Sequence, residues 1–141
     1  MKVTSRVNAE FLMKYKAKAQ ENLVKTADAM KTDLVQSQTI PFGETKINAD
    51  GDVVYSGGNL QNGIINAGTF VDDSKKRQNK AKIVSDTPYA RRLYFHPEFN
   101  FSKVENPNAG GMWFEPYISG NKKDFASKTF SKLMKRSNIW I

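Results

Sequence analysis

The feature that most constrains this chain is a long segment near its start without proline or glycine, the residues that most readily interrupt a helix. The segment covers residues 8–37, and Asn8 can cap a helix there, with Glu10 in the first turn where a negative charge suits the helix dipole. Its apolar positions recur at helical spacing: Leu12, Tyr15, Ala19, Leu23, Ala27, Met30 and Leu34. This pattern predicts one helix with a single apolar face, ended by Pro41 and Gly43.

A helix over residues 8–37 would be about 45 Å long, because each residue adds ~1.5 Å. The whole chain has 141 residues, which is enough for one domain, 1–141, with a modest hydrophobic core. The helix is longer than such a core needs. We therefore expect one of its ends to reach a neighbouring subunit, although a helix lying across a sheet is the alternative.

The middle of the chain has the short apolar runs and turn residues that are typical of strands. Strands are predicted over residues 52–56, 66–71 and 81–85, and the last two would form an antiparallel hairpin. The loop between them carries a cluster of positive charges: Lys75, Lys76, Arg77 and Lys80. These residues either contact DNA phosphates or form a solvated hairpin tip.

The last third of the chain is predicted to contain two helices and a long loop. The first helix covers residues 89–95, after Pro88, with Asp86 or Thr87 as its cap. A loop rich in Pro, Asn and Gly follows over residues 96–111. The second helix covers residues 122–136, and its buried side would hold Phe125, Phe130, Leu133 and Met134. The predicted class is therefore α+β, with a long N-terminal and a C-terminal helix packed on a small, mainly antiparallel sheet.

The formal net charge of +8 favours acidic partners such as nucleic acid or an acidic protein surface. The C-terminal helix is especially basic, with Lys122, Lys123, Lys128, Lys132, Lys135 and Arg136 against Asp124. The chain has no cysteine, no apolar run of a signal peptide and no stretch long enough to span a membrane. We expect a soluble protein that is intracellular when it is made and does not enter a membrane.

No group of residues in the sequence predicts catalysis. His96 is the only histidine, with Glu98 and Glu105 as the nearest carboxylates, and a lone loop histidine is usually a surface or packing residue. Zinc, phosphate-loop and complete calcium motifs are absent. The sequence therefore predicts no enzyme, no metal and no cofactor, and a small hydrolase built around His96 is the least favoured alternative.

The run Thr-Pro-Tyr-Ala-Arg-Arg-Leu-Tyr at residues 87–94, preceded by Gly-Asn-Leu-Gln-Asn at residues 58–62, is the most distinctive motif of the chain. With the long first helix, Pro41, Trp113 and a closing helix in the same order, it resembles the minor capsid, neck or tail-completion proteins of long-tailed bacteriophages. Pro88, Tyr89 and Ala90 match the Pro-Tyr-Ala motif that begins a short helix in that family. The resemblance extends over about four-fifths of the chain, by the order of its motifs.

The resemblance implies a structural virion protein of the head–tail connector. Its copies would form a ring of about six, joining the head-side connector to the tail. The implied partners are head-closure and tail-terminator or tail-tube proteins, with passing contact to genomic DNA. Interface candidates are Tyr89, Arg91, Arg92, Tyr94 and Trp113, and residues 100–111 are expected to lie at an interface as well. A small basic nucleic-acid-binding module is the alternative function.

Overall fold

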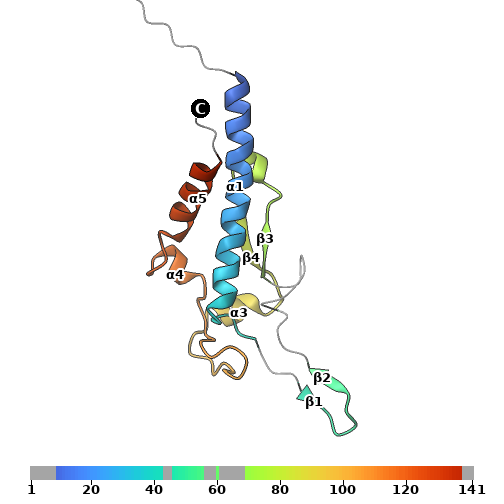
Figure 1. The fold of residues 1–141 in the computed structure, drawn as a ribbon. Coiled ribbons are helices and arrows are strands. Elements are labelled where there is room, and N and C mark those ends of the chain that lie inside the picture. The colour runs from blue at the N-terminus through green and yellow to red at the C-terminus, as the bar shows by residue number, and fades with distance from the viewer. Residues whose placement is uncertain (1–8, 43–45, 56–59, 61–68, 138–141) are drawn as a thin grey trace, which may run out of the picture.

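The structure is a computed structural model that describes residues 9–42, 46–55, 60 and 69–137 (Figure 1). A single long helix, α1, forms the axis of the molecule. The C-terminal helix α5 packs against it, and so do the strands β3 and β4. The α+β class predicted from the sequence is confirmed.

Helix α1 (Ala9–Gln36) matches the predicted segment to within one residue at each end. It stops where the chain turns at Gln38, whose φ of 58° lies in the left-handed region. The apolar face is only partly covered, because Ala27 and Leu34 are buried whereas Leu12, which was predicted to lie in the same stripe, is 50% exposed. Periodicity identifies a face of a helix, but it does not say how far along the helix that face is covered.

The strands form two separate two-stranded sheets. Strands β3 (Thr69–Asp72) and β4 (Lys82–Ser85) make the predicted antiparallel hairpin, in register from Thr69 opposite Ser85 to Asp72 opposite Lys82. Strand β2 (Val53–Tyr55) was predicted, but its antiparallel partner β1 (Lys46–Ile47) was not. The first half of the predicted strand 66–71 lies outside the described residues.

The short helix α3 (Ala90–Tyr94) begins one residue later than predicted, and its cap was predicted wrongly. The N-cap is Tyr89 and makes no capping hydrogen bond through its side chain. The backbone first forms a turn around Pro88, in which the Ala90 N–H donates to the Thr87 carbonyl at 3.0 Å. The Thr87 hydroxyl is buried, with no hydrogen-bond partner among the described residues.

Helix α5 (Phe125–Arg136) also begins later than predicted, and a one-turn helix that was not predicted, α4 (Glu115–Ile118), precedes it. Between the two helices the chain stays in tight turns, because the Lys122 N–H donates back to the Pro116 carbonyl at 2.9 Å. Of the side chains predicted on the inner side of α5, Met134 is buried. The others, Phe125, Phe130 and Leu133, are half-buried.

The core lies at the C-terminal end of α1, around Leu34, Ile40, Leu60, Ala90 and Trp113. A chain of hydrogen bonds crosses it. The Trp113 indole donates to the Ser85 hydroxyl at 3.3 Å, that hydroxyl lies 2.8 Å from the Thr69 hydroxyl, and Thr69 donates to the Leu60 carbonyl at 2.6 Å. Because each hydroxyl has a single proton, Ser85 donates to Thr69. The polar side-chain groups of Trp113, Ser85 and Thr69 are thereby hydrogen-bonded, and residues far apart in the sequence are held together.

Residues 96–111 contain no helix or strand, as predicted, but they are attached to the rest of the chain. The Asn106 amide donates to the Ile40 carbonyl at 2.8 Å, and the Asn108 amide donates to the Ser37 carbonyl at 3.0 Å. Asn106 and Ala109 are buried. This loop therefore closes over the end of α1, and the expectation that residues 100–111 also lie at an interface stays a prediction.

Candidate interaction surfaces

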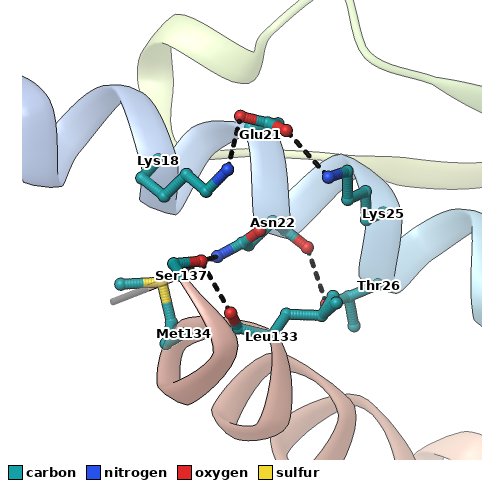
Figure 2. A network of polar contacts seen from close by, with 8 residues as sticks. All are labelled: Lys18, Glu21, Asn22, Lys25, Thr26, Leu133, Met134 and Ser137. Carbon is teal, nitrogen blue, oxygen red and sulfur yellow. Dashed lines mark hydrogen bonds and ion pairs between the residues drawn. The ribbon is translucent and has the colours of Figure 1, made fainter. Parts of the chain in front are cut away.

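Asn22 joins α1 to the end of α5, as Figure 2 shows. Its side chain is 1% exposed, and its amide donates to the Met134 sulfur at 3.1 Å and to the Ser137 hydroxyl at 3.0 Å. Ser137 in turn donates to the Leu133 carbonyl at 2.7 Å. A buried amide with both of its protons bonded fixes the position of α5 along α1, because a displacement would leave polar groups unpaired.

Gln20, two residues before Asn22 in α1, contacts the tip of the β3–β4 hairpin. The tip contains a short 3-10 helix, η1 (Lys76–Gln78), followed by Asn79 in the left-handed conformation with φ of 59°. The Gln20 amide lies 3.4 Å from both the Arg77 carbonyl and the Asn79 side-chain oxygen. The hairpin tip and the end of α5 therefore meet α1 at the same level (Figure 1).

This arrangement gathers basic side chains from distant parts of the sequence around one end of the molecule. We call the basic residues that α1, the hairpin tip and the last turns of α5 carry there the basic end: Lys14, Lys16, Lys18, Lys75, Lys76, Arg77, Lys80, Lys132, Lys135 and Arg136. Glu21 pairs with Lys18 at 3.3 Å and with Lys25 at 2.8 Å, and the hydrogen bonds from Lys25 and Lys18 lower its carboxyl pKa. Most of the basic side chains are exposed, so positive charge is in excess around this end of the molecule.

At the other end of α5, Lys122 and Tyr117 converge on Asp33 of α1. Lys122 donates to the Asp33 carboxylate at 2.8 Å and Tyr117 donates to the same oxygen at 2.5 Å. Burial opposes the charged form of Asp33, but these hydrogen bonds outweigh it and the pKa of the carboxyl is lowered. Burial, together with the bond to Asp33, raises the pKa of the Tyr117 phenol above its usual value. The cluster is a structural contact that fixes the start of α5.

The interface candidates divide into two groups in the structure. Arg91 and Arg92 are exposed and Tyr89 is 42% exposed, so all three remain accessible to a partner. Trp113 is 2% exposed, and Tyr94 packs edge-to-face on it with ring centroids 4.9 Å apart. Trp113 belongs to the core, so the expectation that it forms an interface is corrected. Tyr94 packs against this core but is half-buried, and its place at an interface stays a prediction.

His96 pairs with Glu98, the carboxylate nearest to it in the sequence. The imidazole lies 2.7 Å from the Glu98 carboxylate and stacks on the Phe99 ring, with centroids 4.7 Å apart. The hydrogen bond from His96 lowers the pKa of the Glu98 carboxyl. Arg92 lies over the same ring, with its guanidinium carbon 5.5 Å from the centroid. These stacked side chains order the surface next to α3.

Large apolar side chains are exposed at both ends of the molecule. Leu12 and Met13 are 50% and 73% exposed on the first turns of α1, which extend past the levels at which η1 and α5 contact the helix (Figure 1). Phe95 and Val104 are 62% and 74% exposed at the opposite end. Within the described part of the chain, no helix is both long and apolar enough to cross a membrane. Nor do its described His, Asp and Glu side chains form a group of three or more that could hold a metal ion.

No protein-family model, curated protein or solved structure matches the chain. The phage-neck resemblance therefore stays a prediction, as do the ring, its partners and the contact with DNA. Sequence reasoning found the basic hairpin tip and the basic C-terminal helix separately. It did not find Gln20 and Asn22, the polar residues that bring them together, although polar residues beside the apolar stripe of a long helix are a signal of such contacts.

Proposed function

We propose that this chain is a non-enzymatic structural subunit of the neck of a tailed bacteriophage, where a ring of about six copies joins the head-side connector to the tail. The order of the sequence motifs supports this proposal, from the long first helix through Pro88-Tyr89-Ala90 to the closing helix. Its partners would be other copies of the chain, a head-closure protein and a tail-terminator or tail-tube protein. The protein would reside in the neck region of the virion.

The observation that carries the proposal is the projecting end of α1. The first turns of this helix lie beyond the contacts that Gln20 and Asn22 make, and they bear the exposed side chains Leu12 and Met13. A monomer gains nothing from a helix end that extends into solvent with apolar side chains on it, since exposed apolar surface is unfavourable in water. A subunit of a larger assembly can bury the same side chains against a neighbour.

Arg91 and Arg92 provide the direct test of assembly. Both are exposed, so the double variant Arg91→Glu, Arg92→Glu should keep the unfolding free energy within ~1 kcal/mol. Joining of heads to tails should fall by about tenfold or more, because reversed charges at an interface oppose association by several kcal/mol. Electron microscopy of lysates, counting free heads and tails, measures this.

The control is Lys123→Glu, Lys128→Glu, which makes the same change of charge at exposed positions outside α3. Normal joining by the α3 double variant would exclude these arginines as interface anchors. Mass spectrometry of purified particles tests the proposal as a whole, and absence of the chain from the particles would refute it.

The basic end supports the alternative function, a small nucleic-acid-binding module. Its cations come from α1, the hairpin tip and α5, and Glu21 pairs directly with one of them, Lys18. A surface of this kind binds phosphates without reading sequence. In a neck subunit the same surface could instead face DNA as it passes.

Replacing Lys75, Lys76, Arg77 and Lys80 with Gln tests whether the hairpin tip contacts DNA or is only a solvated loop. All four are exposed, so the fold should survive. If the tip contacts DNA, affinity for a short duplex should fall, and the slope of log affinity against log salt should become shallower by ~0.9 for each phosphate that is no longer neutralised. Fluorescence anisotropy at several salt concentrations measures both quantities.

The matched control replaces Arg91, Arg92, Lys103 and Lys123 with Gln, which removes equal charge from outside the basic end. For a neck subunit we expect weak, salt-sensitive binding by the parent chain. Salt-resistant nanomolar binding to one sequence would instead identify a specific DNA reader and contradict the neck proposal.

A further inference from the structure

The apolar face of α1 is left open between the hairpin and α5, where it forms the floor of a groove. One hollow, of about 400 Å³, has Leu23, Ala27 and Met30 on its floor, with Ile83 of β4 and Ala126 of α5 among its walls. A second hollow, of about 380 Å³, has Tyr15, Ala19 and again Leu23 on its floor. The two hollows meet at Leu23, and we call them together the α1 groove.

The α1 groove is long enough for a helix of several turns. Its floor runs from Tyr15 to Met30, which corresponds to about 22 Å along the helix axis. This floor is most of the stripe whose periodicity predicts a core-facing surface, yet Tyr15, Leu23 and Met30 are only half-buried. The described part of the chain therefore supplies the floor and the two walls of a helix-packing site without a helix in it.

The spacing of large and small residues on the floor suits another helix. Tyr15, Ala19, Leu23 and Ala27 form one row at every fourth position, in which large side chains alternate with alanines. Helices pack by fitting the ridges of one into the grooves of the other, and the half-buried Ala19 leaves a hole for a larger side chain of an incoming helix. An amphipathic helix that lays its apolar face in a groove uses the same geometry.

The charges beside the α1 groove indicate what flanks such a helix would carry. Lys16 lines the second hollow, and no Asp or Glu is among the described residues that line either hollow. A helix with acidic residues beside its apolar face would be attracted to Lys16 and to the positive net charge of the chain. A second copy of this chain, with a net charge of +8, would be repelled.

We propose that the α1 groove binds an amphipathic helix of a different protein, with an apolar stripe flanked by acidic residues. This inference rests on the proposed function, because it assigns the chemistry of one neighbour that a structural subunit would contact. The interaction would bury the half-buried part of the predicted apolar stripe, from Tyr15 to Met30, against a partner. Helix α3 would remain available for other contacts.

A designed peptide of about 16 residues tests the proposal, since that length covers the groove floor at ~1.5 Å per residue. The peptide carries Leu at helical i, i+3, i+4 and i+7 spacing with Glu on both flanks, and a matched peptide carries Lys in place of Glu. Each peptide is titrated into the full chain in an isothermal calorimeter. We expect binding of the Glu peptide and at least tenfold weaker binding of the Lys peptide.

Two tryptophan substitutions in α1 locate the binding site. Ala19→Trp fills a hole in the groove floor, whereas Ala17→Trp places the same side chain at an exposed position two residues away. Binding of the Glu peptide should weaken at least tenfold in the first variant and stay unchanged in the second. Lys16→Glu should weaken the Glu peptide and strengthen the Lys peptide, and circular dichroism checks that each variant is folded.

Several results would overturn the proposal. Equal effects of Ala19→Trp and Ala17→Trp would place binding outside the groove, and equal binding of the two peptides would remove the acidic requirement. A dimer in sedimentation experiments that Ala19→Trp abolishes would make a second copy the occupant. Binding that occurs only after deletion of residues 138–141 would make the chain its own partner. The assay uses the purified chain, so its outcome is independent of whether the chain is found in virions.

Discussion

Replacing Trp113 with alanine is expected to remove about 3–5 kcal/mol from the free energy of unfolding. Trp113 is 2% exposed, packs edge-to-face on Tyr94 and donates the hydrogen bond that begins the chain through Ser85 to Thr69. Alanine would leave a large cavity and remove the donor that Ser85 accepts from. Domains are stable by only about 5–15 kcal/mol, so the variant should be partly or wholly unfolded at 37 °C. Urea denaturation followed by circular dichroism measures the loss.

Two further substitutions make this prediction specific. Val104→Ala removes an apolar side chain that is 74% exposed, and it should change the unfolding free energy by less than ~0.5 kcal/mol. Trp113→Phe keeps an aromatic ring beside Tyr94 but not the indole donor, so its cost should lie between the other two. Similar stabilities for Trp113→Ala and Val104→Ala would show that the core is not centred on this indole.

Local signals in the sequence predicted the helix and the hairpin well. Helix α1 follows from the lack of proline and glycine and from its apolar spacing, and these are properties of consecutive residues. The β3–β4 hairpin follows from two short strands separated by a charged turn. The pairing of β1 with β2 was missed because a strand as short as Lys46–Ile47 has too few residues to show an alternating pattern.

Contacts between distant residues could not be predicted in this way. The positions of Gln20 and Asn22 beside the apolar stripe indicate that they make contacts, but nothing in the sequence identifies Ser137 or the hairpin tip as the partners. The basic end depends on both contacts, so the sequence predicts its separate parts but not their union. The resemblance placed Trp113 at an interface, whereas packing places it in the core, because a motif does not state which of its side chains face inward.

Along the apolar stripe of α1, too, the local sequence predicts the face but not the contacts that cover it. Its helical spacing predicts that one face is apolar, but three different environments follow along that face. Leu34 is 1% exposed in the core, Leu23 is half-buried on the groove floor, and Leu12 is 50% exposed on the projecting turns. A continuous apolar stripe with discontinuous coverage is what a subunit needs if it is to fold alone and then bind neighbours, because the uncovered parts retain apolar surface for the interface.

The projecting turns of α1 lead to the second prediction of large effect, the double variant Leu12→Ser, Met13→Ser. Both side chains are well exposed, so the isolated chain should lose less than ~1 kcal/mol of unfolding free energy. Burial of a Leu or Met side chain at an interface stabilises it by about 1.5–3 kcal/mol. If the chain is a neck subunit, as we propose, loss of both should therefore reduce joining of heads to tails by roughly 100-fold or more. Complementation of a virus lacking the native chain, with infectious titre and electron microscopy as readouts, measures this.

The control for this variant is Ala17→Ser, a polar substitution at an exposed position of the same helix. We expect normal titre from the control and free heads and tails from the double variant. Because Leu12 and Met13 are exposed and contribute little to the fold of the monomer, thermal unfolding of the two purified proteins should differ by only a few degrees. A double variant that folds and still supports normal titre would mean that the projecting end of α1 contacts no neighbour.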